Sequence, residues 1–210
     1  MGWRMWTAAI LAGGQARRLG GQDKGALAVG AGSTTGGTPR SIRERQLAVL
    51  RSLTPHILII GRDGISDRVP GAGALGGLYT ALLESTTDRV LVVACDMPFL
   101  SQALLEHMAR IDADVVIPRT MRGYEPLCAI YSRACIAPMR VRLTRGELEA
   151  SRLLEGVRVA EVGPETLAAY DPNGLLFVNV NTPHDYERAK EVLEERSKTS
   201  RDRIMDELGP

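Results

Sequence analysis

The sequence predicts an α/β fold in which helices cover both faces of a mostly parallel central sheet. Short apolar runs typical of buried strands, such as 56–60 and 89–94, alternate with longer segments of helical pattern. The chain has 210 residues, which suffices for one domain with a sizeable core, and no internal repeat divides it. We therefore expect a single domain over residues 1–196, followed by a charged tail over 197–210.

The expected elements follow one another with short connections. Ser101 is a suitable N-cap for one helix, and Thr182 followed by Pro183 is a suitable start for the last one. Residues 29–38 are rich in Gly, Ser and Thr and indicate a flexible excursion. We expect strands at 7–11, 56–60, 89–94, 115–117, 127–131, 157–162 and 177–180, and helices at about 41–53, 75–83, 101–111, 136–143, 148–155 and from 182 onward.

Charge and cysteine content exclude several classes of protein. The 26 Lys and Arg residues nearly balance the 25 Asp and Glu residues, so no basic field would attract nucleic acid. The three cysteines form no CxxC pair and no zinc-binding pattern, as expected for a reducing compartment. No apolar run is long enough for a signal peptide or a membrane span. We expect a cytoplasmic protein with no nucleic-acid or membrane partner.

A glycine-rich loop after the first strand carries the clearest functional signal. The strand stops at Gly13 and Gly14, and the cations Arg18 and Lys24 follow within the same loop. Glycines let the backbone approach a ligand closely, and exposed N–H groups beside fixed cations suit a triphosphate. The spacing is not that of a P-loop, because Gly25 and not Ser or Thr follows the lysine. The loop therefore predicts nucleotide binding of another kind.

An aspartate follows the strongest predicted strand. Asp96 comes directly after the run 89–94, and Pro98 fixes a turn behind it. Ligands of open α/β sheets bind at the carboxyl ends of the strands, where a carboxylate can hold Mg²⁺ against phosphate oxygens. The structural alternative is that Asp96 caps the next helix, although Ser101 is better placed for that role.

A second glycine-rich segment allows two interpretations. Residues 71–76 fit the pattern GxGxxG of dinucleotide-binding folds, but that fingerprint requires a strand directly before the first glycine. The preceding residues 66–70 are polar and contain Pro70, which disfavours a buried strand. Asp67 in this stretch is either a solvated loop carboxylate or part of a ligand site.

Two amides are expected on one face near the end of the chain. In the predicted strand 177–180, alternation places Asn179 with Asn181, opposite Val178 and Val180. These amides could contact phosphates, metal or an acceptor substrate.

Together these segments resemble the molybdenum cofactor guanylyltransferase (MobA) family. The first matches the pattern LAGGxxxRxGxxDK, and the others are the loop 67–78, CDMPFL at 95–100, EPLCAIY at 125–131 and NVNTPxD at 179–185. The first motif and the DMP turn are shared by a wider nucleotidyltransferase superfamily. The resemblance implies a three-layer Rossmann-like nucleotidyltransferase fold with a mostly parallel central sheet.

The resemblance also implies a reaction and a set of site residues. Such enzymes bind Mg²⁺ and GTP, transfer GMP to the terminal phosphate of molybdopterin and release pyrophosphate. Molybdoenzymes or other proteins of cofactor biosynthesis are possible partners. Carried over by position, Arg18, Lys24 and Asp96 would be catalytic, with Asp96 holding the metal; the binding residues would be Leu11, Ala12, Gly13, Gly14, Lys24, Asp67, Asp96, Asn179 and Asn181.

Departures from the family pattern leave other functions open. Gly61 stands at the tip of the second strand where family members often have asparagine, which puts guanine selectivity in doubt, and Ala74 replaces a usual proline. The chain could be a cytidylyltransferase for the same cofactor, or transfer a nucleotide to another small phosphate. A nucleotide-binding regulatory protein without turnover is the alternative from a different class, but it would not need the metal-binding aspartate.

Overall fold

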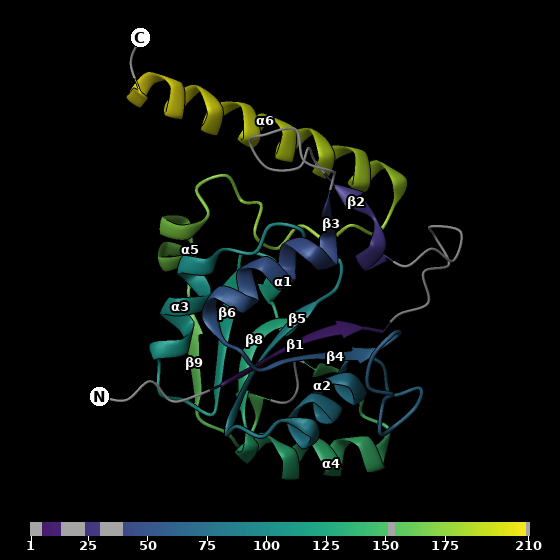
Figure 1. The fold of residues 1–210 in the computed structure, drawn as a ribbon. Helices are drawn as coiled ribbons and strands as arrows, with labels where there is room; N and C mark the ends of the chain where they lie inside the picture. Colours follow the sequence, from purple (N-terminus) through teal and green to yellow (C-terminus); the bar gives the residue numbers. More distant parts are fainter. Residues whose placement is uncertain (1–5, 14–23, 30–39, 151–153, 209–210) are drawn as a thin grey trace.

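The computed structural model describes residues 6–13, 24–29, 40–150 and 154–208, which form a seven-stranded sheet with helices on both faces (Figure 1). The strand order is β4-β1-β5-β8-β6-β7, and β9 pairs with β6. A separate pair, β2 (Ala28–Val29) and β3 (Arg40–Ser41), is antiparallel. The strands of the large sheet are β1 (Thr7–Ala12), β4 (Ile57–Gly61), β5 (Arg89–Ala94), β6 (Val115–Thr120), β7 (Gly123–Tyr124), β8 (Cys128–Ser132) and β9 (Val159–Val162).

The sheet is mixed, but most of its strands run in one direction. β1 is parallel to β4 and β5, and β6 is parallel to β9. β8 lies between β5 and β6 and is antiparallel to both, so β6 runs in the same direction as β5. The carboxyl ends of β4, β1 and β5 therefore meet at one edge, together with the amino end of β8.

Side chains alternate between two helical layers, as expected for a sheet buried on both faces. Ala8 and Ile10 of β1 pack in a cluster with α1, α3 and α5, whereas Ala9 and Leu11 pack in a cluster with α2 and α4 (Figure 1). This arrangement confirms the predicted α/β class with helices on both faces. The helices are α1 (Ile42–Leu53), α2 (Gly73–Glu84), α3 (Gln102–Arg110), α4 (Ile136–Arg145), α5 (Pro164–Tyr170) and α6 (Pro183–Leu208), with short 3₁₀ turns at Lys24–Ala26 and Arg133–Cys135. In the described part of the chain, none of these helices has the length and apolar character needed to cross a membrane.

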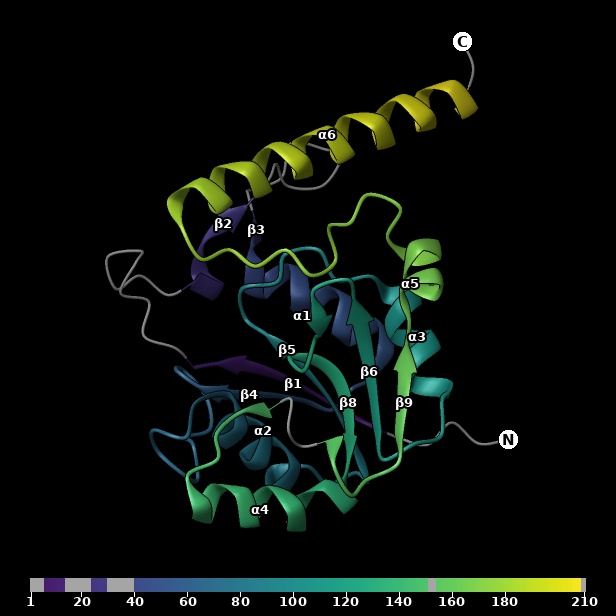
Figure 2. The same ribbon diagram turned by 180° about the vertical axis from the view of Figure 1, so that it is seen from behind.

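Helix α6 begins where the sequence predicts. The Thr182 hydroxyl accepts a hydrogen bond from the Asp185 amide at 3.2 Å, and the Asp185 carboxylate accepts from the amide of Thr182 at 2.8 Å. The helix passes over β2 and β3, where Ala189 and Leu193 pack with Ile42 of α1 (Figure 2). It continues unbroken to Leu208, so the expected boundary between domain and tail falls inside one helix.

Two predicted elements are wrong. Residues 177–180 form no strand, because the segment crosses the end of the sheet and Val180 is buried against α1 and α6 instead of joining a ladder. The predicted helix 148–155 is not an α-helix in its described residues: residues 148–149, which follow the left-handed end of α4 at Gly146 (φ 72°), form no helix, and residues 150 and 154 are in 3₁₀ conformation. Residues 151–153 of that prediction, and 30–38 of the predicted excursion, lie outside the described residues.

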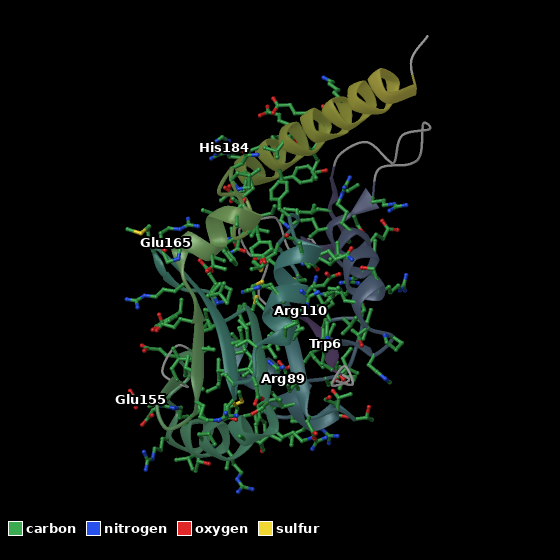
Figure 3. The ribbon with its side chains drawn as sticks, turned by 90° about the vertical axis from the view of Figure 1, so that its left-hand side faces the viewer. Trp6, Arg89, Arg110, Glu155, Glu165 and His184 are labelled. Atoms are coloured by element: carbon green, nitrogen blue, oxygen red, sulfur yellow. The ribbon has the colours of Figure 1, made fainter. Side chains whose placement is uncertain are left out.

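A buried arginine fastens the amino end of β5 to a helix end. Arg89 is 6% exposed and lies inside the fold in Figure 3. Its guanidinium donates to the carbonyls of Ala109 and Ile111 at 3.0 and 2.8 Å, at the carboxyl end of α3. Carbonyls at a helix end lack partners within the helix, so the cation satisfies them and interacts favourably with the helix dipole. This contact anchors the end of β5 opposite to the predicted site.

A candidate nucleotide-transfer site at the edge of the sheet

A cleft of about 810 Å³ opens at the sheet edge where β4, β1 and β5 end. Its size suits a small-molecule ligand. Three predicted residues lie outside this account: Gly14 and Arg18 are not among the described residues, and of Lys24 only the backbone, at the start of a 3₁₀ turn, is described. The cleft brings together all the others, namely Leu11, Ala12, Gly13, Asp67, Asp96, Asn179 and Asn181.

The backbone of β1 reaches the cleft at Gly13. A Cβ added at Gly13 would meet no atom within 4 Å, so packing within the described residues does not require glycine there. Gly61, at the end of the neighbouring strand β4, is different: its φ is +99°, and a Cβ would lie 3.1 Å from Ala12 C and Gly13 N. Glycine at 61 therefore lets the two strand ends approach closely, which gives a physical reason for the departure from asparagine at this tip.

The loop that carries Asp67 is held to the middle and the carboxyl end of α2. The Arg68 amide donates to the Thr80 hydroxyl at 2.9 Å, and that hydroxyl donates to the Gly76 carbonyl at 2.8 Å. The Arg68 guanidinium also pairs with Glu84. Desolvation by burial raises the pKa of the Asp67 carboxyl. The residues directly before Gly71, 66–70, form no strand, so the structure does not support the dinucleotide-fold interpretation of this loop.

Asp96 stands directly after β5, in the middle of the edge. Its Oδ1 atom is buried, while the residue as a whole is partly exposed to the cleft. Its carbonyl accepts a hydrogen bond from the Val180 amide at 2.9 Å, and the preceding Cys95 amide donates to the Leu11 carbonyl at 3.2 Å. The Ser101 hydroxyl caps α3 by accepting from the Leu104 amide. The capping role considered for Asp96 is thus filled by Ser101.

The two asparagines lie on the cleft although their segment is not a strand. The bond from Val180 to the Asp96 carbonyl fixes this segment against the Asp96 turn. Val180 is fully buried, and Asn179 and Asn181 on either side of it line the cleft. The predicted alternation therefore holds in an irregular segment outside the sheet.

Two charged residues of the cleft have no role in the sequence-based account. Arg62 follows Gly61 and is exposed at the cleft; only its place after a strand end signals it. Glu125, from the turn before β8, lines the side of the cleft beyond Asp96. Burial raises the pKa of Glu125, although the Arg122 charge and a 3.4 Å hydrogen bond from Thr120 oppose this shift. Glu125 is the first residue of the family motif EPLCAIY, but neither that motif nor the surrounding sequence assigned a function to its carboxylate.

We expect Glu125→Gln to stabilise the ligand-free protein at neutral pH. Because burial raises the folded-state pKa of Glu125 above its ordinary 4.5, the ionised form opposes folding. This penalty is absent well below pH 4.5 and develops fully as the pH rises through the raised pKa. The melting temperature of the variant should therefore exceed that of the wild type at pH 7, and the difference should vanish in acid. An equal difference at both pH values would show that ionisation of Glu125 does not oppose folding.

The donors in the cleft suit a magnesium ion that arrives with phosphate. Asp96 supplies a carboxylate and the two asparagines supply amide oxygens, which are the hard ligands that Mg²⁺ takes. Among the residues that the structure describes, no group of three or more His, Cys, Asp and Glu side chains could hold a metal ion by itself. Because Mg²⁺ usually binds through one or two carboxylates together with water and substrate phosphates, the cleft fits that mode of binding.

The sequence matches the model of a known domain family over most of its length. The model describes a MobA-like NTP transferase domain, and residues 8–162 match it. The chain belongs to this family. The match runs from β1 to the end of β9 and includes the glycine loop, the Asp67 loop, Asp96 and Glu125.

Curated relatives of this MobA-like protein extend the match to nearly the whole chain. A protein of Pelotomaculum thermopropionicum, named a probable molybdenum cofactor guanylyltransferase, is 34% identical over 93% of this chain and 96% of its own. A molybdenum cofactor guanylyltransferase of Desulfosudis oleivorans is 28% identical over 89% of this chain and 95% of its own.

Solved structures share the architecture of this MobA-like chain. Molybdopterin-guanine dinucleotide biosynthesis protein A of Archaeoglobus fulgidus aligns with a TM-score of 0.72 at 26% identity, over 89% of this chain and 97% of its own. A 2-C-methyl-D-erythritol 4-phosphate cytidylyltransferase of Thermus thermophilus aligns with a TM-score of 0.58 at 17% identity, over 88% of this chain and 96% of its own. The second likeness shows the fold alone. The Rossmann-like nucleotidyltransferase fold implied by the sequence is confirmed.

Proposed function

We propose that this protein transfers GMP from GTP to molybdopterin, so that a guanine dinucleotide form of the cofactor is made and pyrophosphate is released. The observation that carries the proposal is the meeting of the Gly13 loop, Asp67, Asp96 and two asparagines in one cleft of a MobA-like domain. Relatives that match nearly the whole chain are named molybdenum cofactor guanylyltransferases, which specifies the base and the acceptor.

The strand order supports the assignment of one side of the cleft to the nucleotide. Gly13 and the Asp67 loop lie on the side of β1, β4 and α2, and these are the segments that we assign to the nucleotide. Backbone N–H groups at the glycine loop, with Arg18 and Lys24, would bind the triphosphate. Arg62 adds a cation at the same end of the cleft. Transfer of a nucleotidyl group needs alignment and charge neutralisation more than a covalent catalyst.

Asp96, between the two sides of the cleft, is the residue that we assign to Mg²⁺. When bound there, the ion would neutralise charge on the phosphates and hold them in line for transfer. Asn179 and Asn181, in the segment that is hydrogen-bonded to the Asp96 turn, would hold phosphate or acceptor groups. The turn itself is fixed by backbone hydrogen bonds to β1 and to the asparagine segment, so the carboxylate is positioned before substrate binds.

We also propose that the protein works in the cytoplasm. Cys95, Cys128 and Cys135 are buried and form no disulfide bond, as suits a reducing compartment. Burial raises the pKa of the Cys128 thiol to about 12, so it is not a reactive thiolate at neutral pH. Molybdoenzymes or other proteins of cofactor biosynthesis would receive the product.

We expect Gly13→Val to weaken GTP binding at least about tenfold, or ~1.4 kcal/mol. The Cβ of the new side chain would meet no atom of the described protein within 4 Å, and Gly13 lines the cleft where we place the phosphates, so the added methyl groups compete with them for space. Calorimetric titration with Mg²⁺–GTP measures the effect. Gly163→Val is the matched control, because its Cβ also meets open space, at the start of α5 and away from the cleft. If the Gly13 variant binds GTP as the control does, the nucleotide does not lie against this loop.

A further inference from the structure

Helix α1 buries a polar side chain where its pattern calls for an apolar one. The residues of α1 that face the core are Ile42, Gln46 and Leu50, one on each turn. Gln46 is 1% exposed, and glutamine is seldom buried so completely. Its Nε2 atom donates to the carbonyl of Ala94 at 2.7 Å and to that of Met97 at 3.0 Å.

These two carbonyls enclose the turn that carries Asp96. Ala94 is the last residue of β5, and Met97 lies just past the aspartate, so one amide group spans the turn. The same turn is fixed to β1 through the Cys95 amide and to the asparagine segment through the Asp96 carbonyl. Gln46 supplies the remaining anchor, from the helix layer beneath the turn. It does not line the cleft itself.

This arrangement costs the fold an unsatisfied polar atom. Oε1 of Gln46 is buried and has no hydrogen-bond partner among the described residues. Inverting the amide would not help, because both carbonyls accept hydrogen bonds and would then face an oxygen. A buried acceptor without a donor is destabilising, whereas an apolar side chain of similar length would continue the stripe of Ile42 and Leu50. What distinguishes glutamine from an apolar residue here is the pair of hydrogen bonds that it donates at the Asp96 turn.

We propose that Gln46 is a positioning residue, which fixes where the Asp96 carboxylate stands by holding the backbone on both sides of it. Gln46 acts only through the turn and touches neither substrate. The inference rests on the proposed role of Asp96 in holding the metal of a bound nucleotide. It predicts that loss of Gln46 impairs the metal-dependent part of nucleotide binding and the rate of transfer, and leaves metal-independent binding unchanged. Partners that orient metal ligands typically change metal affinity or activity 10–100-fold.

The test compares Gln46→Met with Leu50→Met in the full chain. Both variants place methionine in the same buried stripe of α1, but only the first removes the bonds to Ala94 and Met97. Binding of Mn²⁺–GTP is followed by water proton relaxation, binding of GTP in EDTA by calorimetry, and folding by thermal melting. For Gln46→Met we expect Mn²⁺–GTP binding weakened about 10-fold or more and kcat lowered about 10–100-fold, with GTP binding in EDTA equal to wild type. Leu50→Met should match wild type in both binding measurements, in thermal melting and in kcat of nucleotidyl transfer.

Several results would overturn the proposal. Wild-type Mn²⁺–GTP binding and kcat in a folded Gln46→Met protein would do so, as would an equal loss in Leu50→Met. If Gln46→Met does not fold, Gln46→Glu replaces it: the shape is kept, but a carboxylate cannot donate to two carbonyls, so Mn²⁺–GTP binding should again fall. Wild-type binding in Gln46→Glu would contradict the role of the donors.

The same experiment separates this inference from the proposed function. If the wild type binds Mn²⁺–GTP but transfers no label to molybdopterin, a selective loss in Gln46→Met still supports the positioning role, while the acceptor assignment fails. If the wild type shows no metal-dependent GTP binding, the metal role of Asp96 and the role of Gln46 fail together.

Discussion

Asp96→Asn should lower the rate of nucleotidyl transfer by about 10³-fold or more and leave the protein folded. The substitution keeps the shape of the side chain and removes the negative charge that would hold Mg²⁺ at the centre of the cleft. Removing even one preorganised group that stabilises transition-state charge costs about 10²–10³-fold, and a metal ligand should cost no less. Steady-state transfer at saturating GTP and Mg²⁺ measures the loss in kcat, and thermal melting checks the fold.

Asp112→Asn is the matched control for this variant. Asp112 is exposed and precedes β6, at the end of that strand opposite to the cleft, so the same change of charge should leave transfer unaffected. If Asp96→Asn turns over at the wild-type rate with Mg²⁺, Asp96 does not hold the metal. If both variants are impaired alike, the effect comes from net charge and not from the cleft.

Gly64→Ala should destabilise the fold by about 3 kcal/mol, the upper part of the usual range for an overpacked site. Gly64 lies in the tight turn after β4, where the Gly61 amide donates to the Ile65 carbonyl at 2.7 Å and the Ile65 amide to the Ile59 carbonyl at 2.8 Å. A Cβ at Gly64 would lie 2.2 Å from the carbonyl oxygen of Ile59, so the turn must open before any side chain fits. Urea denaturation gives the difference in unfolding free energy.

The control for this prediction is Gly163→Ala, at a glycine whose added Cβ would meet nothing within 4 Å. It should change the unfolding free energy by less than about 1 kcal/mol. Arg62, which lines the cleft, belongs to the same turn as Gly64. The Gly64 variant should therefore also bind GTP more weakly. A Gly64→Ala protein as stable as the control would mean that the turn rearranges without cost.

Local pattern predicted most of the sheet and the centre of the site. The runs that became β1 and β5 are apolar after their first residue because both faces of these strands are covered, and such runs show in the sequence. The glycine loop and Asp96 could be placed together because each directly follows such a strand. Alternation placed Asn179 and Asn181 on one face, and the family pattern assigned them and Asp67 to the substrate site, which the local sequence had left open.

What the sequence could not predict depends on contacts between distant segments. The alternation in 177–180 is real, but only the position of the segment, against the Asp96 turn and α1, shows that it has no strand to pair with. The role of Gln46 depends on two carbonyls about fifty positions away in the chain, and helix α1 otherwise has an ordinary amphipathic pattern. Glu125 precedes a strand that runs against its neighbours, so its side chain reaches the cleft from a direction that its local sequence does not reveal.

The most direct test of the whole account is transfer of label from [α-³²P]GTP to molybdopterin in the presence of Mg²⁺, with [α-³²P]CTP in parallel. We expect label from GTP to appear in the acceptor, with release of unlabelled pyrophosphate and little transfer from CTP. Transfer from CTP alone would keep the site and overturn the choice of base. Transfer from neither nucleotide, while GTP still binds, would contradict the proposed reaction and leave a nucleotide-binding protein in its place.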